Sequence, residues 1–102
     1  MKEISAENYD ESVKEGLVVV EAWAEWCSQC PRMVSILEQL EPEFEGKIKF
    51  VKFSVGENME LGQKLGVMTL PTMFLYKDGV LIDQKSGVIA KNEFRRWLEA
   101  AL

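Results

Sequence analysis

Two cysteines separated by two residues, Cys27 and Cys30, are the residues of this sequence best suited to do chemistry. A dithiol at this spacing is typical of redox sites, in which a thiolate attacks a disulfide sulfur. The spacing also fits half of a zinc site, but structural zinc normally takes four ligands, and the chain has no further cysteine and no histidine. A zinc site would need carboxylates or a second protein, and an inert buried thiol is a third possibility. We predict no metal site.

The dithiol lies between a predicted strand and a predicted helix. The apolar run Leu17–Val20 opens a strand that extends to about Trp23. Because the first turn of a helix has unpaired N–H groups and the positive end of the helix dipole, it favours a thiolate over a thiol. The placement therefore predicts a reactive dithiol. Downstream, four apolar residues recur at the spacing of one helix face, namely Met33, Ile36, Leu37 and Leu40.

Helices and strands alternate along the rest of the chain. The helix after the cysteines should run to about Glu45, with Pro42 kinking or fraying its last turn, because proline has no N–H to donate. Gly16 and Gly46 suit the left-handed ends of two helices. This order predicts an α/β sandwich around a mixed sheet, in a single domain over residues 1–102. The other predicted elements are a helix over Ala6–Lys14 capped by Ser5, a strand over Ile48–Val55, a helix over Asn58–Leu65, a strand over Thr72–Tyr76, a hairpin turn at Asp78-Gly79, a strand over Val80–Ile82, and a last helix carrying Phe94, Trp97, Leu98 and Ala101.

The composition limits the kinds of partner. The formal net charge of −5 argues against nucleic acids and anionic membranes, since both attract a basic surface, and its simplest role is solubility. No segment approaches the ~20 apolar residues of a membrane span. The polar start, Met1–Ser5, lacks the apolar core of a signal peptide. We therefore expect a cytoplasmic protein that binds neither nucleic acid nor membrane.

The sequence resembles the thioredoxin family over nearly its whole length. A lone pair of cysteines is weak evidence, but four features in the family's order are specific. The resemblance implies a thioredoxin fold, which is a five-stranded mixed sheet, here with a very short first strand, flanked by four helices. The four features are the segment Ala22–Cys30, the segment Leu70-Pro71-Thr72, similar to the family's loop with a cis proline, the hairpin Lys77-Asp78-Gly79 followed by Gly87, and the amphipathic C-terminal helix.

The resemblance gives the two thiols and the proline loop distinct roles. Cys27, the cysteine nearer the strand, would attack a substrate disulfide, and Cys30 would resolve the mixed disulfide. Pro71 would be cis, although only ~5–6% of X–Pro bonds in folded proteins are. The backbone of Leu70 would then be free to pair with an extended substrate. The substrate would dock on a rim formed by Trp26, Ser28, Gln29, Val55, Thr69, Leu70 and Val88.

Glu21 interrupts the apolar strand where the strand should be buried. A buried carboxylate without a partner tends to keep its proton, so its pKa is raised. Thioredoxins usually carry Asp at the matching position, and protein disulfide isomerases, which share the fold, carry Glu. The resemblance therefore implies that Glu21 accepts the proton of Cys30, directly or through water. Lys52 matches a family lysine that approaches this acid. The alternative is that Glu21 or Lys52 simply faces solvent.

The sequence departs from the family pattern around the dithiol. Ser28 and Gln29 stand where thioredoxins commonly have Gly-Pro, Pro31 replaces the usual basic residue, and Ser35 stands where the family helix often has a kinking proline. Pro31 is tolerated only in the first helical turn, where its missing N–H would have had no partner. These departures bear on the redox potential and the choice of reductase, not on the dithiol chemistry.

The sequence thus predicts a thioredoxin-like protein-disulfide reductase that works by dithiol–disulfide exchange. There is no Gly-rich fingerprint for a dinucleotide, so we expect no bound cofactor and re-reduction by a separate thioredoxin reductase, NADPH- or ferredoxin-linked. We expect a monomer. One alternative is a disulfide isomerase or oxidase, which Glu21 favours and the absence of a histidine between the cysteines disfavours. A non-catalytic binding module is the other.

Overall fold

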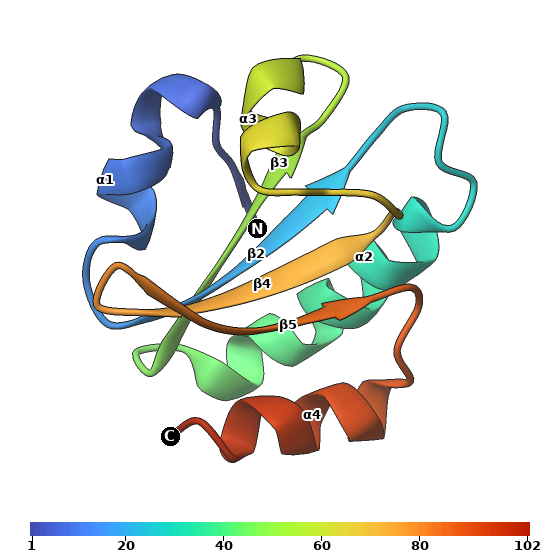
Figure 1. Ribbon diagram of the computed structural model, residues 1–102. Coiled ribbons are helices and arrows are strands. Elements are labelled where there is room, and N and C mark those ends of the chain that lie inside the picture. Colours follow the sequence, from blue (N-terminus) through green and yellow to red (C-terminus); the bar gives the residue numbers. More distant parts are fainter.

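The computed structural model describes all 102 residues, which form one mixed sheet with helices on both faces (Figure 1). The strands lie in the order β1-β3-β2-β4-β5. The predicted five-stranded sheet with a very short first strand and four flanking helices is confirmed. The strands are β1 (Lys2–Glu3), β2 (Leu17–Trp23), β3 (Ile48–Ser54), β4 (Thr72–Lys77) and β5 (Val80–Ser86), the helices are α1 (Tyr9–Val13), α2 (Cys30–Leu40), α3 (Met59–Lys64) and α4 (Lys91–Glu99), and 3₁₀ turns cover Ala6–Asn8 and Glu41–Phe44.

The central strand, β2, is covered on both faces. It pairs in parallel with β3 and antiparallel with β4, while β1 and β5 form the edges of the sheet. Val18, Val20 and Ala22 join the core cluster under α1 and α3, and Val19 joins the cluster under α2 and α4. This double burial explains why the strand is a continuous apolar run. Since alternate residues share a face, Glu21 points to the same side as Val19, toward α2.

The helix after the cysteines is shorter than predicted. It ends at Leu40 instead of about Glu45, and the chain continues as a 3₁₀ turn over Glu41–Phe44. Pro42 accounts for the change, because it has no N–H to donate to the carbonyl of Glu38. The predicted fraying at this proline is therefore confirmed. No helix of the protein is long and apolar enough to cross a membrane.

The first helix is also shorter than predicted. Of the range Ala6–Lys14, only Tyr9–Val13 is α-helical, and the preceding residues form a 3₁₀ turn with Ser5 in the N-cap position. Gly16 and Gly46 have φ angles of +69° and +81°. Both angles lie in the left-handed region that favours glycine, as predicted.

The last strand is longer than predicted. It was expected over Val80–Ile82 and extends to Ser86. Because β5 lies at the edge of the sheet, Asp83 and Gln84 remain in solvent while their backbone pairs with β4. The loss of the apolar pattern after Ile82 therefore does not end the strand.

A buried hydrogen bond joins α1 to the sheet. The hydroxyl oxygens of Tyr9 and Tyr76 lie 2.7 Å apart, and the two residues are only 4% and 6% exposed. We expect Tyr9→Phe to lower the free energy of unfolding by about 2 kcal/mol, because it leaves the buried hydroxyl of Tyr76 without a partner. The double variant Tyr9→Phe/Tyr76→Phe should lose less free energy of unfolding than the sum of the losses in Tyr9→Phe and Tyr76→Phe. Urea unfolding of wild type and these three variants measures the coupling between the two hydroxyls, and strictly additive losses would contradict it.

Candidate active site

A disulfide joins Cys27 and Cys30 at the junction of β2 and α2, with their Cα atoms 5.5 Å apart. Two backbone hydrogen bonds close the turn. The N–H of Cys27 donates to the carbonyl of Ala24 (3.1 Å), and the N–H of Cys30 donates to the carbonyl of Cys27 (3.3 Å). Cys27 is half-buried, whereas Cys30 is only 2% exposed. The turn therefore offers one cysteine to a partner and keeps the other inside.

The dithiol turn leads directly into the start of α2. Cys30 is the first residue of the helix and Pro31 the second. At that position Pro31 interrupts no helical hydrogen bond, which is why the helix accepts it, as predicted. The positive end of the α2 dipole lies at the dithiol and favours a thiolate there. Ser28 and Gln29 are exposed beside it.

Glu21 is fully buried in the middle of β2, at 0% exposure, and neither of its carboxylate oxygens has a hydrogen-bond partner. The alternative in which Glu21 faces solvent is therefore wrong. Burial removes the water that would stabilise the charge and raises the pKa of Glu21 to about 8. The ammonium of Lys52 opposes this rise in pKa, whereas Glu3 and Glu38 add to it. At neutral pH the carboxyl group holds its proton most of the time.

Lys52 is not a freely solvated lysine. It lies opposite Glu21 on the neighbouring strand β3, and its side chain is 22% exposed. Its ammonium contacts Glu3, at 4.0 Å, and sits 5.5 Å from the ring centroid of Trp23. Lys52 is thus a partly exposed neighbour of the buried acid in the sheet.

A cavity of about 320 Å³ lies behind the disulfide and extends from Cys27 to Lys52. Its volume is sufficient for several water molecules, and its walls include hydroxyl, carboxylate and ammonium groups that water could bridge. The cavity therefore links the dithiol to the neighbourhood of Glu21. It is lined by Trp23, Ala24, Glu25, Cys27, Pro31, Val34, Ser35, Glu38 and Lys52.

The loop before β4 faces the dithiol and contains the cis peptide bond Leu70–Pro71 that the resemblance implied. Pro71 is buried, and its carbonyl accepts the N–H of Gly87 at 2.8 Å. The hydroxyl of Thr72 donates to the carbonyl of Thr69 at 2.6 Å. The first bond ties the loop to the chain that follows β5, and the second lies within the loop itself.

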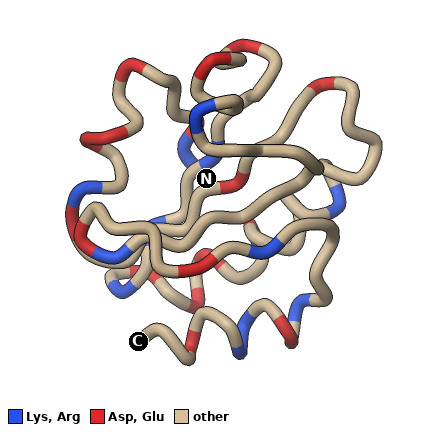
Figure 2. Tube along the Cα trace, viewed as in Figure 1, with Lys and Arg blue, Asp and Glu red and all other residues tan.

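An open groove of about 440 Å³ runs along the dithiol between its turn and this loop. Trp26, which forms part of it, is 67% exposed. Charged residues of both signs are spread over much of the chain, but residues 26–31 and 65–76 carry none (Figure 2). An uncharged, partly apolar groove suits an extended peptide segment. The groove is lined by Trp26, Cys27, Ser28, Gln29, Met68 and Leu70.

Comparison with known proteins agrees with this geometry, since the family model described as thioredoxin matches residues 1–100. The chain belongs to the thioredoxin family. A thioredoxin of Rickettsia bellii is 38% identical over 81 residues, which cover 79% of this chain and 77% of the relative. A thioredoxin of Staphylococcus haemolyticus is 32% identical over 99 residues, covering 97% and 95%. A thioredoxin of Pseudomonas aeruginosa is 35% identical over 86 residues, covering 84% and 80%.

Family membership and the disulfide between Cys27 and Cys30 together identify the chain as a thiol–disulfide oxidoreductase of the thioredoxin type, a protein-disulfide reductase. The predicted dithiol chemistry is thereby confirmed. Thioredoxins act on disulfide substrates and are reduced in turn by thioredoxin reductase. No group of three or more His, Cys, Asp or Glu side chains is placed to hold a metal ion.

Of the residues predicted to form the docking rim of this thioredoxin fold, three do not line the groove. Thr69 is exposed beside it. Val55 packs against the core cluster under α1 and α3, and Val88 packs against the cluster under α2 and α4. Val88 still lies close to Pro71, because the preceding residue, Gly87, is hydrogen-bonded to the proline carbonyl. These three residues are therefore not part of the groove lining.

Two residues of the site were not singled out from the sequence. Met68 lines the groove and is 93% exposed. Its position just before the cis-proline loop is the sequence feature from which its place in the groove could have been predicted. At Gly56, a Cβ atom would lie 3.0 Å from Cζ3 of Trp26 and 2.5 Å from Oε2 of Glu25. A larger residue at this position would push both side chains away. No sequence pattern reveals this contact, because it joins two separate loops.

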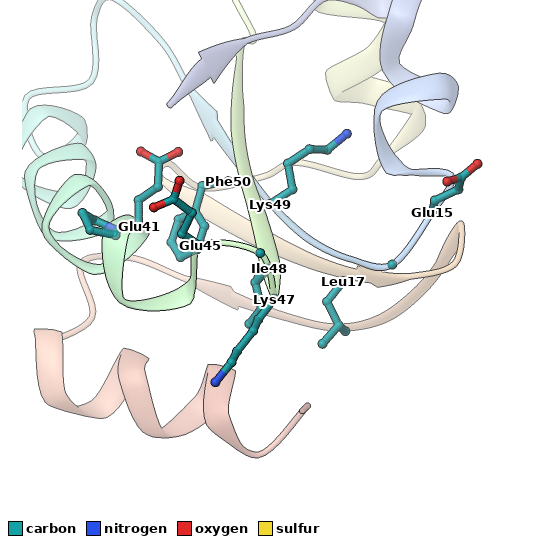
Figure 3. Close-up of a pocket in the computed structure, with 11 residues that line it drawn as sticks. Glu15, Leu17, Glu41, Glu45, Lys47, Ile48, Lys49 and Phe50 are labelled. Atoms are coloured by element: carbon teal, nitrogen blue, oxygen red, sulfur yellow. The ribbon is translucent and has the colours of Figure 1, made fainter.

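Another cavity, of about 610 Å³, is separate from the dithiol (Figure 3). It lies where β3 begins, after the 3₁₀ turn that follows α2, and it contains neither cysteine. Its charged residues carry both signs, namely Glu15, Glu41, Glu45, Lys47 and Lys49.

The raised pKa of Glu21 predicts a pH-dependent stability. The folded state binds this proton more tightly than the unfolded state, so the stabilisation is fully present below about pH 4.5 and is lost as the pH rises through about 8. We expect the free energy of unfolding to fall by about 4 kcal/mol over this range, since each pKa unit corresponds to about 1.4 kcal/mol. Glu21→Gln should remove this slope, whereas Glu7→Gln, which changes an exposed carboxylate, should keep it. Urea unfolding across the range measures both, and an unchanged slope in Glu21→Gln would contradict the assignment.

Proposed function

We propose that, in the reduction of protein disulfides, Cys27 is the attacking sulfur and Cys30 the resolving sulfur. One observation carries this assignment: Cys27 lines both the open groove and the cavity behind the disulfide, whereas Cys30 lines neither and is 2% exposed. A substrate disulfide lying in the groove meets Cys27 first. Cys30 then reaches the mixed disulfide from inside the protein, where a second substrate molecule does not compete.

The exchange takes place in two balanced steps. The Cys27 thiolate attacks one sulfur of the substrate disulfide, whose S–S bond breaks, and the other substrate sulfur leaves as a thiolate and takes up a proton. Cys30 then gives up its proton and attacks the sulfur of Cys27, which releases the second substrate sulfur. Two electrons have passed to the substrate, and the chain is left with the Cys27–Cys30 disulfide seen in the structure.

Glu21 in its ionised form, which is the minor form at neutral pH, serves as the base that takes the proton of Cys30 in the second step. Its pKa of about 8 is close to the pKa of about 8.5 of an ordinary thiol. Proton transfer between the two groups is therefore nearly balanced in free energy, which suits a general acid–base pair. The helix α2, which begins at Cys30, packs on the face of the sheet to which Glu21 points. The cavity that ends at Lys52 supports transfer through water.

Substrates bind as extended segments along the groove. Trp26, Ser28, Gln29 and Leu70 contact the segment, and the backbone of Leu70 pairs with it because Pro71 turns the loop toward the dithiol. Thr69, Val55 and Val88 add to the surrounding surface.

The proposal extends to partners and location. We place the chain in the cytoplasm as a monomer, with residues 1–102 as one domain, acting in electron transport and cell redox homeostasis. A separate reductase, NADPH- or ferredoxin-linked, supplies electrons through its own thiols, and no bound cofactor takes part. The net charge of −5 supports the exclusion of nucleic acids and anionic membranes as partners.

Single cysteine variants test the roles of the two sulfurs. Cys27→Ser should abolish insulin reduction in a turbidity assay with dithiothreitol, because the attacking sulfur is gone. Cys30→Ser should accumulate covalent mixed disulfides with substrates, visible on non-reducing gels, and Cys27→Ser/Cys30→Ser is the control that traps nothing. A wild type no more active than these variants would instead support the binding module. Trapping by Cys27→Ser instead of Cys30→Ser would reverse the assigned roles.

The role of Glu21 predicts a specific kinetic defect. Glu21→Gln should slow the resolution of a mixed disulfide by about 100-fold near neutral pH, since general acid–base catalysis typically contributes that much. The initial attack by Cys27 should be little affected. Rapid acid quenching of the reaction with a peptide disulfide measures both steps. Glu38→Gln is the control, because it removes a carboxylate from the wall of the cavity behind the disulfide. It should resolve the mixed disulfide far faster than Glu21→Gln does. Equal rates in wild type and Glu21→Gln would refute the role.

A further inference from the structure

Three ionisable residues lie side by side across three adjacent parallel strands. Glu3 of β1 is in register with Lys52 of β3, and Lys52 is in register with Glu21 of β2. Residues in register on parallel strands point to the same face of the sheet. The side chains of Glu3 and Lys52 are 46% and 22% exposed, and Glu21 is 0% exposed. The row therefore runs from the solvent to the core, with the ammonium between two carboxyl groups.

The ammonium of Lys52 is engaged on its outer side only. It lies 4.0 Å from Oε1 of Glu3 and 5.5 Å from the ring centroid of Trp23. The indole N–H of Trp23 donates to Oε2 of the same Glu3 carboxylate at 3.0 Å. Glu3, Lys52 and Trp23 thus form a closed set of contacts. On the inner side, both oxygens of Glu21 lack any hydrogen-bond partner, and no ion pair within 4.0 Å joins Glu21 to Lys52.

We propose that Glu3 is a positioning residue for the proton transfer, because it holds the Lys52 ammonium on the solvent side and so keeps Glu21 unpaired and able to carry a proton. The proposal rests on the role of Glu21 given above and adds a residue that acts on it through Lys52. Trp23 has a supporting part, because its indole N–H fixes the Glu3 carboxylate in the orientation that meets the ammonium.

Electrostatics gives the direction of the effect. Burial raises the pKa of Glu21, Lys52 lowers it, and the negative charges of Glu3 and Glu38 raise it. Removing the Glu3 charge therefore lowers the pKa of Glu21 directly. It also frees Lys52 to turn inward and pair with the acid, which lowers the pKa further. The charged groups that face Glu21 come from β1, β3 and α2, whereas β4 places the uncharged Met73 opposite it.

The matched variants Glu3→Gln and Glu38→Gln separate these two effects. Both remove one negative charge from the surroundings of Glu21, but only Glu3 is ion-paired with Lys52. We expect the titration midpoint of the Glu21 carboxyl carbon, followed by ¹³C NMR in the oxidised protein, to fall by about one pH unit in Glu3→Gln. In Glu38→Gln it should fall by less than half as much. An equal or smaller shift in Glu3→Gln would overturn the proposal.

A second experiment, in the Lys52→Met variant, tests whether Glu3→Gln acts only by weakening the pairing of β1 with β3. In Lys52→Met no ammonium remains to be held, so adding Glu3→Gln should move the Glu21 midpoint no more than Glu38→Gln does. A shift that persists undiminished in this background would show that Glu3 does not act through Lys52. The titration does not depend on Glu21 serving the reaction. If Glu21 is not the base of the reaction, Glu21→Gln will resolve the mixed disulfide at the wild-type rate. That result is independent of the titration midpoints measured in the Glu3 and Glu38 variants.

Discussion

A carboxyl group buried without a partner in the central strand is the constraint on which this active site depends. An ionised carboxylate there would be strongly unfavourable, so Glu21 is tolerated because it keeps its proton over most of the pH range. The strand can carry such a residue because it is held on both sides by β3 and β4 and because its valines are fully buried. The acid therefore sits in a rigid part of the fold, where its environment is fixed.

The site is arranged along one line that leads from the solvent to this acid. The groove meets Cys27, Cys27 borders the cavity, and the cavity ends at Lys52, the neighbour of Glu21 in the sheet. Different parts of the fold position these groups. The dithiol turn and the start of α2 position the cysteines, and the register of two parallel strands positions Lys52 beside Glu21. A displacement of any one of them would separate sulfur chemistry from proton transfer. In the proposed mechanism, this arrangement lets a chain without a histidine couple the two.

Much of this arrangement follows from local sequence patterns. The apolar run of β2 predicts burial on both faces, and Glu21 in its midst predicts a buried acid, because nothing in a covered strand lets one residue reach solvent. Pro42 predicts a weakened last turn of α2 through its missing N–H, although the helix ends at Leu40 and not near Glu45 as expected. The cis bond at Pro71 follows only from the resemblance to the thioredoxin family, since X–Pro bonds are rarely cis.

Other features depend on long-range register, which local patterns do not contain. The two residues of β1 give no strand signal of their own, so the alignment of Glu3 with Lys52 appears only once the sheet is formed. The space beside Gly56 and the position of Met68 in the groove likewise depend on how separate loops meet. The length of β5 was underestimated because an edge strand needs no apolar pattern to pair.

Several departures from the family pattern lie around the dithiol, and Glu21 itself stands where thioredoxins usually carry Asp. Pro31 has no N–H, so the first turn of α2 has one free donor fewer with which to stabilise a thiolate. The exposed Ser28 and Gln29 add polar groups next to the sulfurs instead. The charged groups that act on Glu21 come instead from β1, β3 and α2. Because Ser28, Gln29 and Pro31 lie beside the sulfurs, a change in the dithiol turn bears first on the stability of the thiolate.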